Sequence, residues 1–338
     1  MKTLVCTEPG KFEYKEADRP QLTKGHAILK IKRIGVCGTD LHAFEGTQPY
    51  FNYPRILGHE LAAELVETDD SSGFEIGEPV TIIPYFNCGH CIACRTGKPN
   101  CCVTLNVCGV HIDGGMSEYL AVPSYSLVHS NGLSFDELAL VEPLAIGAHG
   151  IRRAGVTDNE FVLVIGAGPI GLGAMEFAHI AGGKVIAMDM NAARLQFCGD
   201  KLKVGHSVNA MDMNAAEQIR DITGGDMPSV VIDATGSQRA INSGFKYMAH
   251  GGRYVLIGLQ KGDISFSHPE FHKREGTLMS SRNATRADFE HVIQSLKNKL
   301  IDPLTYITHG INFDQIKDEF ASLLLPETGV IKAMIHFE

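Results

Sequence analysis

The sequence predicts a two-domain α/β protein, in which an N-terminal β domain is followed by a doubly wound domain with a parallel sheet. Three observations lead to this fold class. The 338-residue chain exceeds the roughly 100 to 200 residues of a usual single domain. Near Phe161 the apolar pattern changes from alternating runs to short Val/Ile runs separated by helix-length segments. A glycine-rich turn directly follows the first of these runs.

The first part of the chain has the pattern of an all-β domain with loops. Short apolar runs, such as residues 27–32 and 80–83, are broken by Gly, Pro and Asn up to about Leu140. Runs of this length bounded by turn residues predict strands. We therefore expect the N-terminal domain to be built from strands and loops.

The second part has the pattern of strands that alternate with helices. Strands are predicted at residues 162–165, 185–188, 230–234 and 254–257. Because helix-length segments separate them, these strands predict βαβ units and a parallel sheet. A further helix is predicted at 287–297, and a short β-like ending at 329–337 resembles the first domain again.

Composition excludes several classes of function. A formal net charge of −9 disfavours a polyanionic partner, so we expect no nucleic acid. No stretch approaches the roughly 18 apolar residues of a membrane span, and the start has no sustained apolar segment. We expect a cytoplasmic protein without a membrane partner. In that compartment the nine cysteines indicate metal ligands and free thiols rather than disulfides.

The glycine-rich turn has the order that dinucleotide binding requires, between a strand at 161–165 and a helical segment at 172–181. Its residues are Gly166, Ala167, Gly168, Pro169, Ile170 and Gly171. Gly166 permits the tight turn, Gly168 the approach of pyrophosphate, and Gly171 the packing of helix on strand. The free N–H groups of the helix N-terminus attract the phosphates. The alternative is a glycine turn in an ordinary α/β fold.

The next strand ends in an acidic residue, Asp189, at the distance expected for a ligand of the adenosine ribose. A carboxylate there repels a 2′-phosphate, so the sequence favours NAD over NADP. Arg194 lies five residues later. Arg194 could stack near the adenine, or its positive charge could weaken the exclusion of a 2′-phosphate.

Four cysteines lie within fifteen residues in a loop rich in Gly, Asn and Pro: Cys88, Cys91, Cys94 and Cys102. This spacing predicts a closed zinc site, because four thiolates complete a tetrahedral shell and leave no position for substrate. The metal there should be structural. The alternative is a cluster of free or redox-active thiols. Cys101, next to Cys102, could compete as the fourth ligand.

A second candidate metal set is dispersed along the chain and consists of Cys37, His59, Glu60 and Glu142. Thiolate, imidazole and carboxylate suit zinc, and a site with few protein ligands keeps a position open for a reactant. Spacing alone does not distinguish these residues from a buried cysteine and a hydrogen-bonded histidine.

Several motifs occur together in one order: Gly35-Val36-Cys37-Gly38-Thr39-Asp40-x-His42, Gly58-His59-Glu60, the four-cysteine segment, Gly114-Gly115-x-x-Glu118-Tyr119 and the glycine turn. As a set they resemble the zinc-containing medium-chain alcohol dehydrogenases. The resemblance covers essentially the whole chain. It implies a GroES-like catalytic domain at 1–143, a Rossmann domain at 144–282 and a C-terminal return at 283–338. It also implies two zinc ions, NAD and a homo-oligomer, either dimer or tetramer.

The resemblance makes Cys37 and His59 ligands of a catalytic zinc. Glu142 stands where ordinary alcohol dehydrogenases carry cysteine, which resembles the sorbitol and threonine dehydrogenase branch. In that branch the acid that matches Glu60 can also approach the metal, so either carboxylate could bind. Within the branch, segments 47–51, 109–115, 269–273 and 281–285 resemble dehydrogenases of sugar acids such as L-gulonate or L-galactonate.

The expected reaction transfers a hydride from a secondary alcohol of a small polyhydroxy substrate to NAD. Zinc acidifies a bound alcohol oxygen as it does bound water. Thr39 resembles the hydroxyl that takes this proton, and His42 resembles the outer end of a relay to solvent. Arg282 and Lys273 are candidates for binding a substrate carboxylate. The alternatives are a neutral polyol or L-threonine as substrate, or a non-catalytic NAD-sensing protein.

Overall fold

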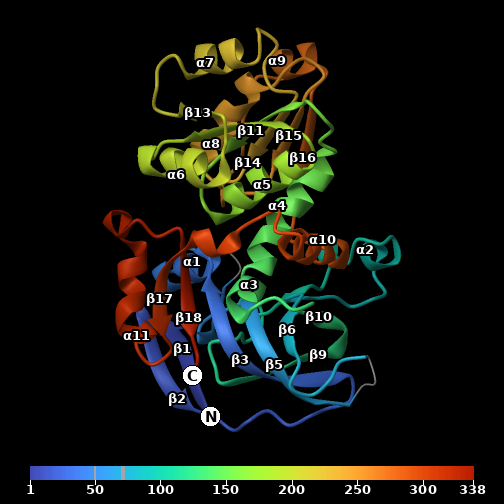
Figure 1. Ribbon diagram of the computed structural model, residues 1–338, viewed down its shortest axis with the longest axis vertical. Helices are drawn as coiled ribbons and strands as arrows, with labels where there is room; N and C mark the ends of the chain where they lie inside the picture. The colour runs from blue at the N-terminus through green and yellow to red at the C-terminus, as the bar shows by residue number, and fades with distance from the viewer. Residues whose placement is uncertain (49–50, 70–72) are drawn as a thin grey trace. The chain divides into compact units, whose positions relative to one another are not determined.

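A computed structural model describes residues 1–48, 51–69 and 73–338 of the chain (Figure 1). The chain forms two compact units. One combines Met1–Pro143 with Thr285–Glu338, and the other is Leu144–Ala284. The first unit is thus built from both ends of the chain. Part of segment 47–51, which the sequence associates with the substrate, lies outside the described residues.

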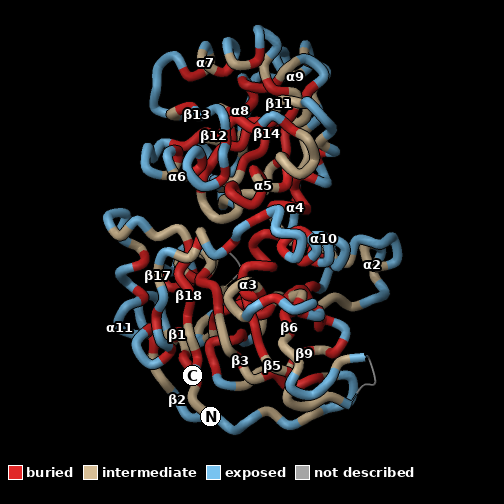
Figure 2. The backbone as a smooth tube through the Cα atoms, in the orientation of Figure 1, coloured by how far each residue is buried: buried red, intermediate tan, exposed pale blue. Residues whose placement is uncertain are grey.

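The first unit is built on a mostly antiparallel sheet with the strand order β10-β6-β5-β3-β18-β17, and β9 also pairs with β3. Two smaller sheets have the orders β2-β1-β4 and β7-β8. The strands are β1 (Lys2–Glu8), β2 (Lys11–Glu16), β3 (His26–Val36), β4 (Arg55–Ile56), β5 (Glu60–Thr68), β6 (Pro79–Ile82), β7 (Tyr85–Phe86), β8 (Asn106–Val107), β9 (Tyr119–Pro123), β10 (Leu127–His129), β17 (Ile307–Asn312) and β18 (Lys332–His336). Side chains of these strands, such as Leu29, Ile31 and Leu61, form the core. Figure 2 colours most of β18 as buried.

Helices interrupt the β structure of this unit. The helix predicted at 287–297 is α10 (Arg286–Lys297), whereas the all-β prediction for the first part of the chain did not anticipate α1 (Gly38–Glu45), α2 (Ile92–Arg95) and α3 (Phe135–Ala139). The unit also contains the start of α4 (Val141–Ala154) and α11 (Ile316–Glu319). α1 begins where the Asp40 carboxylate accepts the N–H of Cys37 at 3.0 Å, and it ends at Gly46 with φ +79°. Such short helices are set by their caps rather than by a long apolar period.

The second unit contains a six-stranded parallel sheet with the order β13-β12-β11-β14-β15-β16. The strands are β11 (Phe161–Ile165), β12 (Lys184–Asp189), β13 (His206–Asn209), β14 (Val230–Asp233), β15 (Arg253–Leu256) and β16 (Thr277–Ser280). The helices are α5 (Pro169–Ile180), α6 (Ala192–Leu202), α7 (Ala215–Ile222), α8 (Gln238–Gly244) and α9 (His268–Lys273). The strand order reverses between β11 and β14, and doubly wound sheets bind ligands at the carboxyl ends of strands beside such a point.

The four central strands of this sheet lie where the Val/Ile runs predict them, but the two edge strands were not predicted. In β13 only Val208 is buried, and β16 has no fully buried residue. Because an edge strand is covered less than a central one, it does not need the continuous apolar run that reveals a buried parallel strand.

None of the helices in the described part of the chain has the length and apolar character that a membrane span requires.

Candidate functional site

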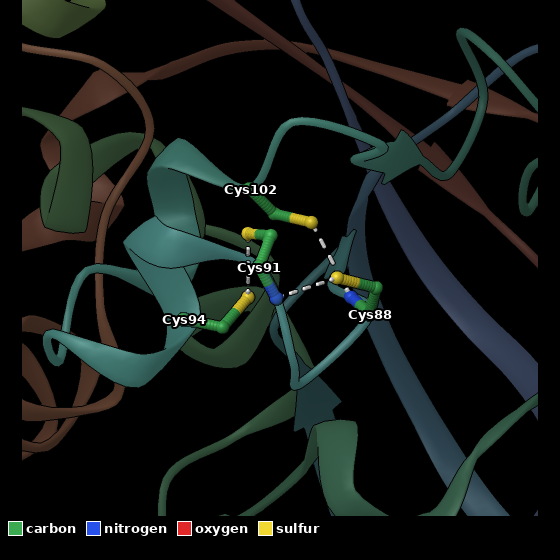
Figure 3. Close-up of side chains that lie close together, drawn as sticks. All are labelled: Cys88, Cys91, Cys94 and Cys102. Atoms are coloured by element: carbon green, nitrogen blue, oxygen red, sulfur yellow. Dashed lines mark hydrogen bonds between the residues drawn. The ribbon is translucent and has the colours of Figure 1, made fainter.

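The four-cysteine segment forms a cluster of sulfur atoms (Figure 3). The Sγ atoms of Cys88, Cys91, Cys94 and Cys102 all lie within 4.8 Å of one another. A zinc–sulfur bond of about 2.3 Å places tetrahedral ligands about 3.8 Å apart. The Sγ atoms of Cys91 and Cys94, for example, are 3.4 Å apart. The cluster therefore fits a zinc ion, while Cys101 is exposed and is not part of it.

Backbone N–H groups prepare this loop for thiolates. The N–H of Cys88 donates to Cys102 Sγ at 3.3 Å, and the N–H of Cys91 donates to Cys88 Sγ at 3.4 Å. The N–H groups of His90 and Cys91 hold the pKa of the Cys88 thiol down at about 6. A hydrogen bond to the charged form favours that form, and the thiolate is the form that binds metal.

A second group of candidate ligands lies at one end of strands β3 and β5. Cys37, His59 and Glu60 each offer a ligand atom, and these atoms lie within 4.8 Å of one another. The antiparallel register explains this, because Gly35 pairs with Glu60 and so places Cys37 and His59 at the same end of the two strands. Thiol, imidazole and carboxylate donors suit zinc.

His59 faces a buried carboxylate. Asp40 is fully buried and accepts the N–H groups of Cys37 at 3.0 Å and Gly58 at 3.2 Å. Its Oδ1 lies 3.7 Å from His59 Nδ1, an atom that makes no hydrogen bond within the described structure. Burial would lower the pKa of His59, but Asp40 and Cys37 raise it well above its ordinary value. A carboxylate at one ring nitrogen leaves the other to a metal.

The two acidic residues of the expected zinc set are held by different partners. Glu60 accepts both of its hydrogen bonds from the Lys332 ammonium on β18, each at 2.6 Å. Glu142, in the first turn of α4, accepts a hydrogen bond from the Tyr85 hydroxyl on β7. Burial raises the pKa of Glu142 to about 7, while the charge of His59 acts in the opposite direction. Glu60, and not Glu142, belongs to the group within 4.8 Å.

The two residues of the expected proton relay lie on α1. Thr39 is half-buried in the first turn, and His42 is exposed three residues later. Residues three apart face the same side of a helix. His42 Nδ1 lies 3.2 Å from the Thr47 hydroxyl and 3.4 Å from the Glu45 carboxylate. This places the histidine end of the pair in solvent.

The three glycines of the turn in the second unit differ in backbone conformation and in the space around them. Gly166 has φ +102°, a conformation that L side chains rarely adopt. A Cβ on Gly171 would lie 1.8 Å from the carbonyl oxygen of Gly166. A Cβ on Gly168 would meet only Arg194 Nη1, at 4.0 Å. α5 starts at Pro169, followed by Ile170, without a side-chain cap, so its first N–H groups face this open space.

Asp189 links the end of β12 to this turn. Its Oδ2 accepts the N–H of Ala167 at 2.7 Å, and its Oδ1 accepts the N–H of Asn191 at 2.8 Å. Each carboxylate oxygen has a second lone pair, so the side chain can still accept a ribose hydroxyl.

Gly168 and Gly171 allow a matched experiment, because the space around them differs. Gly171→Ala is expected to lower the melting temperature clearly, because its Cβ meets the backbone at 1.8 Å. Gly168→Ala should leave the melting temperature nearly unchanged, since its surroundings are open and its φ of −83° suits alanine. It should weaken NAD binding by about tenfold or more, because the methyl group occupies the space for pyrophosphate. Thermal scans and NAD titrations measure both effects, and equal melting temperatures for the two variants would contradict this explanation.

The two candidates for a substrate carboxylate lie at opposite ends of the parallel strands. Arg282 follows the carboxyl end of β16, and the glycine turn leaves the carboxyl end of the parallel strand β11. Lys273 ends α9, just before the amino end of β16, where its Nζ is 3.9 Å from Glu270 Oε2 and 62% of its side chain is exposed. A four-residue strand spans about 13 Å. One substrate carboxylate therefore cannot contact both candidates in this arrangement, and Arg282 is the one at the same end of the sheet as the glycine turn.

Sequence reasoning missed three partners of the candidate ligands: Asp40, Tyr85 and Lys332. A signal existed for Lys332, which is the charged residue within the apolar run 330–335. A signal also existed for Asp40, three residues after Cys37 in the helix-capping position. Tyr85 has no local signal, because its contact with Glu142 joins residues 57 positions apart.

Comparison with known proteins agrees with this geometry. Residues 23–132 match the alcohol dehydrogenase GroES-like domain, and residues 169–298 match the zinc-binding dehydrogenase family. The L-galactonate-5-dehydrogenase of Escherichia coli K12 is 41% identical over 100% of this chain and 99% of its own. A sorbitol dehydrogenase of Halalkalibacterium halodurans is 31% identical over 91% of this chain and 92% of its own.

A solved structure gives the same result in three dimensions. The RspB alcohol dehydrogenase of Escherichia coli CFT073, complexed with NADH, superposes with a TM-score of 0.91 at 29% identity, covering 100% of this chain and 99% of its own. These matches confirm the fold class of a GroES-like β domain plus a Rossmann domain. The chain belongs to the zinc-binding, GroES-like family of alcohol dehydrogenases.

Proposed function

We propose that this dehydrogenase oxidises the C5 alcohol of a sugar acid, L-gulonate or L-galactonate, to a keto sugar acid and transfers the hydride to NAD. The observation that carries the substrate is the 41% identity to an L-galactonate-5-dehydrogenase over the whole chain. The chain also carries a candidate zinc group and a glycine turn suited to a dinucleotide. These are the two components that hydride transfer from an alcohol requires.

In this proposal Cys37 and His59 hold the catalytic zinc together with a carboxylate. Two carboxylates are available as the third ligand. Glu60 lies within 4.8 Å of both side chains, and Glu142 is the ligand when Glu60 is held by Lys332. Bound zinc would acidify the alcohol oxygen. A second zinc would sit among the four cysteines, where it stabilises the loop and contacts no substrate.

Thr39 and His42 would move the alcohol proton to solvent. The half-buried Thr39 hydroxyl would take the proton, and the exposed His42 imidazole would pass it to water. Histidine suits this step because its ordinary pKa lies near neutral pH.

Gly166, Gly168 and Gly171 would receive the pyrophosphate of NAD, and Asp189 would accept a ribose hydroxyl. Arg194 would lie beside the phosphates, because its guanidinium is the group that faces Gly168. The negative charge of Asp189 disfavours a 2′-phosphate, in agreement with NAD rather than NADP.

The substrate is tested by initial rates of NAD reduction on L-gulonate, L-galactonate, sorbitol, xylitol and L-threonine with zinc-replete enzyme. We expect the highest kcat/KM with one of the two sugar acids. A higher kcat/KM with sorbitol or xylitol would replace the proposal by polyol oxidation, which the 31% identical sorbitol dehydrogenase favours. Preference for L-threonine would equally contradict it.

Arg282 is proposed to bind the substrate carboxylate. Arg282→Ala is expected to raise the KM for the preferred sugar acid by about tenfold or more, because a charged hydrogen-bonded pair is lost. The KM for sorbitol should change far less, since sorbitol has no carboxylate. Steady-state kinetics on both substrates, with Lys273→Ala as the control at the opposite end of β16, measure the difference. Equal changes for the acid and the polyol would show that Arg282 has another role.

We further propose that the enzyme is a cytoplasmic homo-oligomer, either a dimer or a tetramer. Light scattering of the purified enzyme at micromolar concentration tests the assembly, and fractionation of cells tests the compartment. The partner in either case is a small polyhydroxy molecule, with no role for nucleic acid or membrane.

A further inference from the structure

A buried lysine holds one of the candidate zinc ligands. Lys332 Nζ donates to both Glu60 oxygens at 2.6 Å and to the carbonyl oxygen of Val36 at 3.1 Å. Only 2% of the lysine side chain and 0% of the glutamate side chain are exposed. Lysine and glutamate are rarely buried this completely unless they are paired. The pair lies inside the group of Cys37, His59 and Glu60 rather than at the surface.

The sheet is built so that this pair can form. Lys332 is on β18 and Glu60 on β5, and β3 lies between the two strands. The glutamate therefore has to cross β3, and it does so over Gly35. A Cβ at Gly35 would lie 2.1 Å from Glu60 Oε2. The missing side chain of Gly35 thus leaves the space in which the carboxylate meets the ammonium.

We propose that Lys332 is a positioning residue that holds Glu60 away from the catalytic zinc and so keeps a position on the metal open for the substrate. The inference rests on the zinc site of the proposed function. The ammonium donates to both carboxylate oxygens and so holds the side chain over Gly35. It also repels a divalent cation nearby, and such a repulsion is strong in a buried site.

The proposal and a purely structural role of Lys332 predict opposite changes in zinc affinity when the lysine is removed. Without Lys332, the metal-free protein contains an unpaired buried carboxylate, which is strongly destabilising. Bound zinc would relieve that charge, so the loss of Lys332 destabilises the metal-free form more than the zinc form. By linkage, zinc must then bind more tightly. A lysine that only supports the fold predicts the opposite, because disorder at the ligands weakens metal binding.

The test is the affinity for the catalytic zinc in Lys332→Met, measured on the full chain by competition with a chelator of known affinity. Methionine has a similar volume and no charge. We expect zinc to bind at least about tenfold more tightly than in the wild type. The KM for the preferred substrate should rise, because Glu60 then competes for the open position. The titration step of the catalytic zinc is identified by its absence in Cys37→Ser.

Two further variants make the result specific. Lys32→Met removes another lysine of the same sheet, whose Nζ lies 3.3 Å from Glu64 in a more exposed pair, and it should leave the zinc affinity unchanged. Adding Glu60→Gln to Lys332→Met should abolish the gain in affinity, because the gain depends on the glutamate charge.

If metal-free Lys332→Met does not fold, its recovery on adding zinc is measured instead. Folding that zinc restores in Lys332→Met but not in Lys332→Met combined with Cys37→Ser supports the proposal, because the site of the four cysteines is intact in both variants.

Unchanged or weaker zinc binding in Lys332→Met would overturn the proposal, as would a failure to fold even with zinc. A wild-type enzyme that binds only the zinc of the four cysteines would overturn it together with the catalytic zinc site. The substrate preference of the wild type is a separate measurement, so a wrong substrate class leaves the role of Lys332 standing.

Discussion

Replacing His59 by alanine is expected to lower kcat/KM by roughly 10³-fold or more, which corresponds to about 4 kcal/mol of transition-state stabilisation. The imidazole is the neutral ligand in the group that it forms with Cys37 and Glu60. Without it, a thiolate and a carboxylate remain, and the buried Asp40 loses the group that its Oδ1 faces at 3.7 Å. Metal analysis should show a loss from two zinc ions per chain to one.

The matched control is His129→Ala in the same unit. His129 Nδ1 lies 2.6 Å from the Glu78 carboxylate, and 46% of the histidine side chain is exposed. An exposed pair of this kind contributes about 0 to 1 kcal/mol, so kcat/KM and the zinc content should both stay unchanged. If His59→Ala kept two zinc ions per chain, the assignment of the catalytic metal would be wrong.

The second large effect is expected from replacing a cysteine of the four-cysteine loop, and it concerns the stability of the protein rather than its catalysis. Cys102→Ser is expected to remove the structural zinc and to lower the melting temperature markedly, because metal binding contributes directly to the folding of such a loop. Cys101→Ser, at the neighbouring position, should change the free energy of unfolding by less than about 0.5 kcal/mol. Cys102 is 2% exposed and faces the other three sulfur atoms, whereas Cys101 is exposed.

Metal analysis and thermal scans of the two serine variants decide between the adjacent cysteines. The prediction requires the zinc loss and the lower melting temperature to occur in Cys102→Ser alone. The same losses in Cys101→Ser would identify Cys101 as the fourth ligand. Retention of both zinc ions in Cys102→Ser would favour a cluster of free thiols.

The fold class and the glycine turn could be predicted because their signals are local. The turn that begins at Gly166 needs a strand, three glycines and a helix within a few residues. The structure shows a backbone reason for Gly166 and a steric reason for Gly171, while the space at Gly168 is open. The central strands of the second unit are buried on both faces, so each must be a continuous apolar run. The edge strand β13 has one buried residue, and nothing in its sequence distinguishes it from a loop.

The dispersed candidate ligands could be named only by their resemblance to a family. Cys37 and His59 are 22 positions apart in the sequence, and it is the pairing of β3 with β5 that brings their ligand atoms within 4.8 Å. The same reasoning named Lys273 and Arg282 as candidates for a substrate carboxylate, and it did not foresee that β16 separates them. Similarity to a family gave the identity of these residues but not their surroundings.

The sequence by itself determined the two-domain α/β class, the four-cysteine loop and the dinucleotide turn, because short-range spacing is enough to specify each of them. Only the tertiary structure showed that Lys332 holds Glu60, which lies within 4.8 Å of Cys37 and His59, and that Tyr85 holds Glu142. The physical reason is that a buried charge must be paired, and its partner comes from whichever strand the sheet places beside it. For Glu60 that partner lies 272 positions away in the chain.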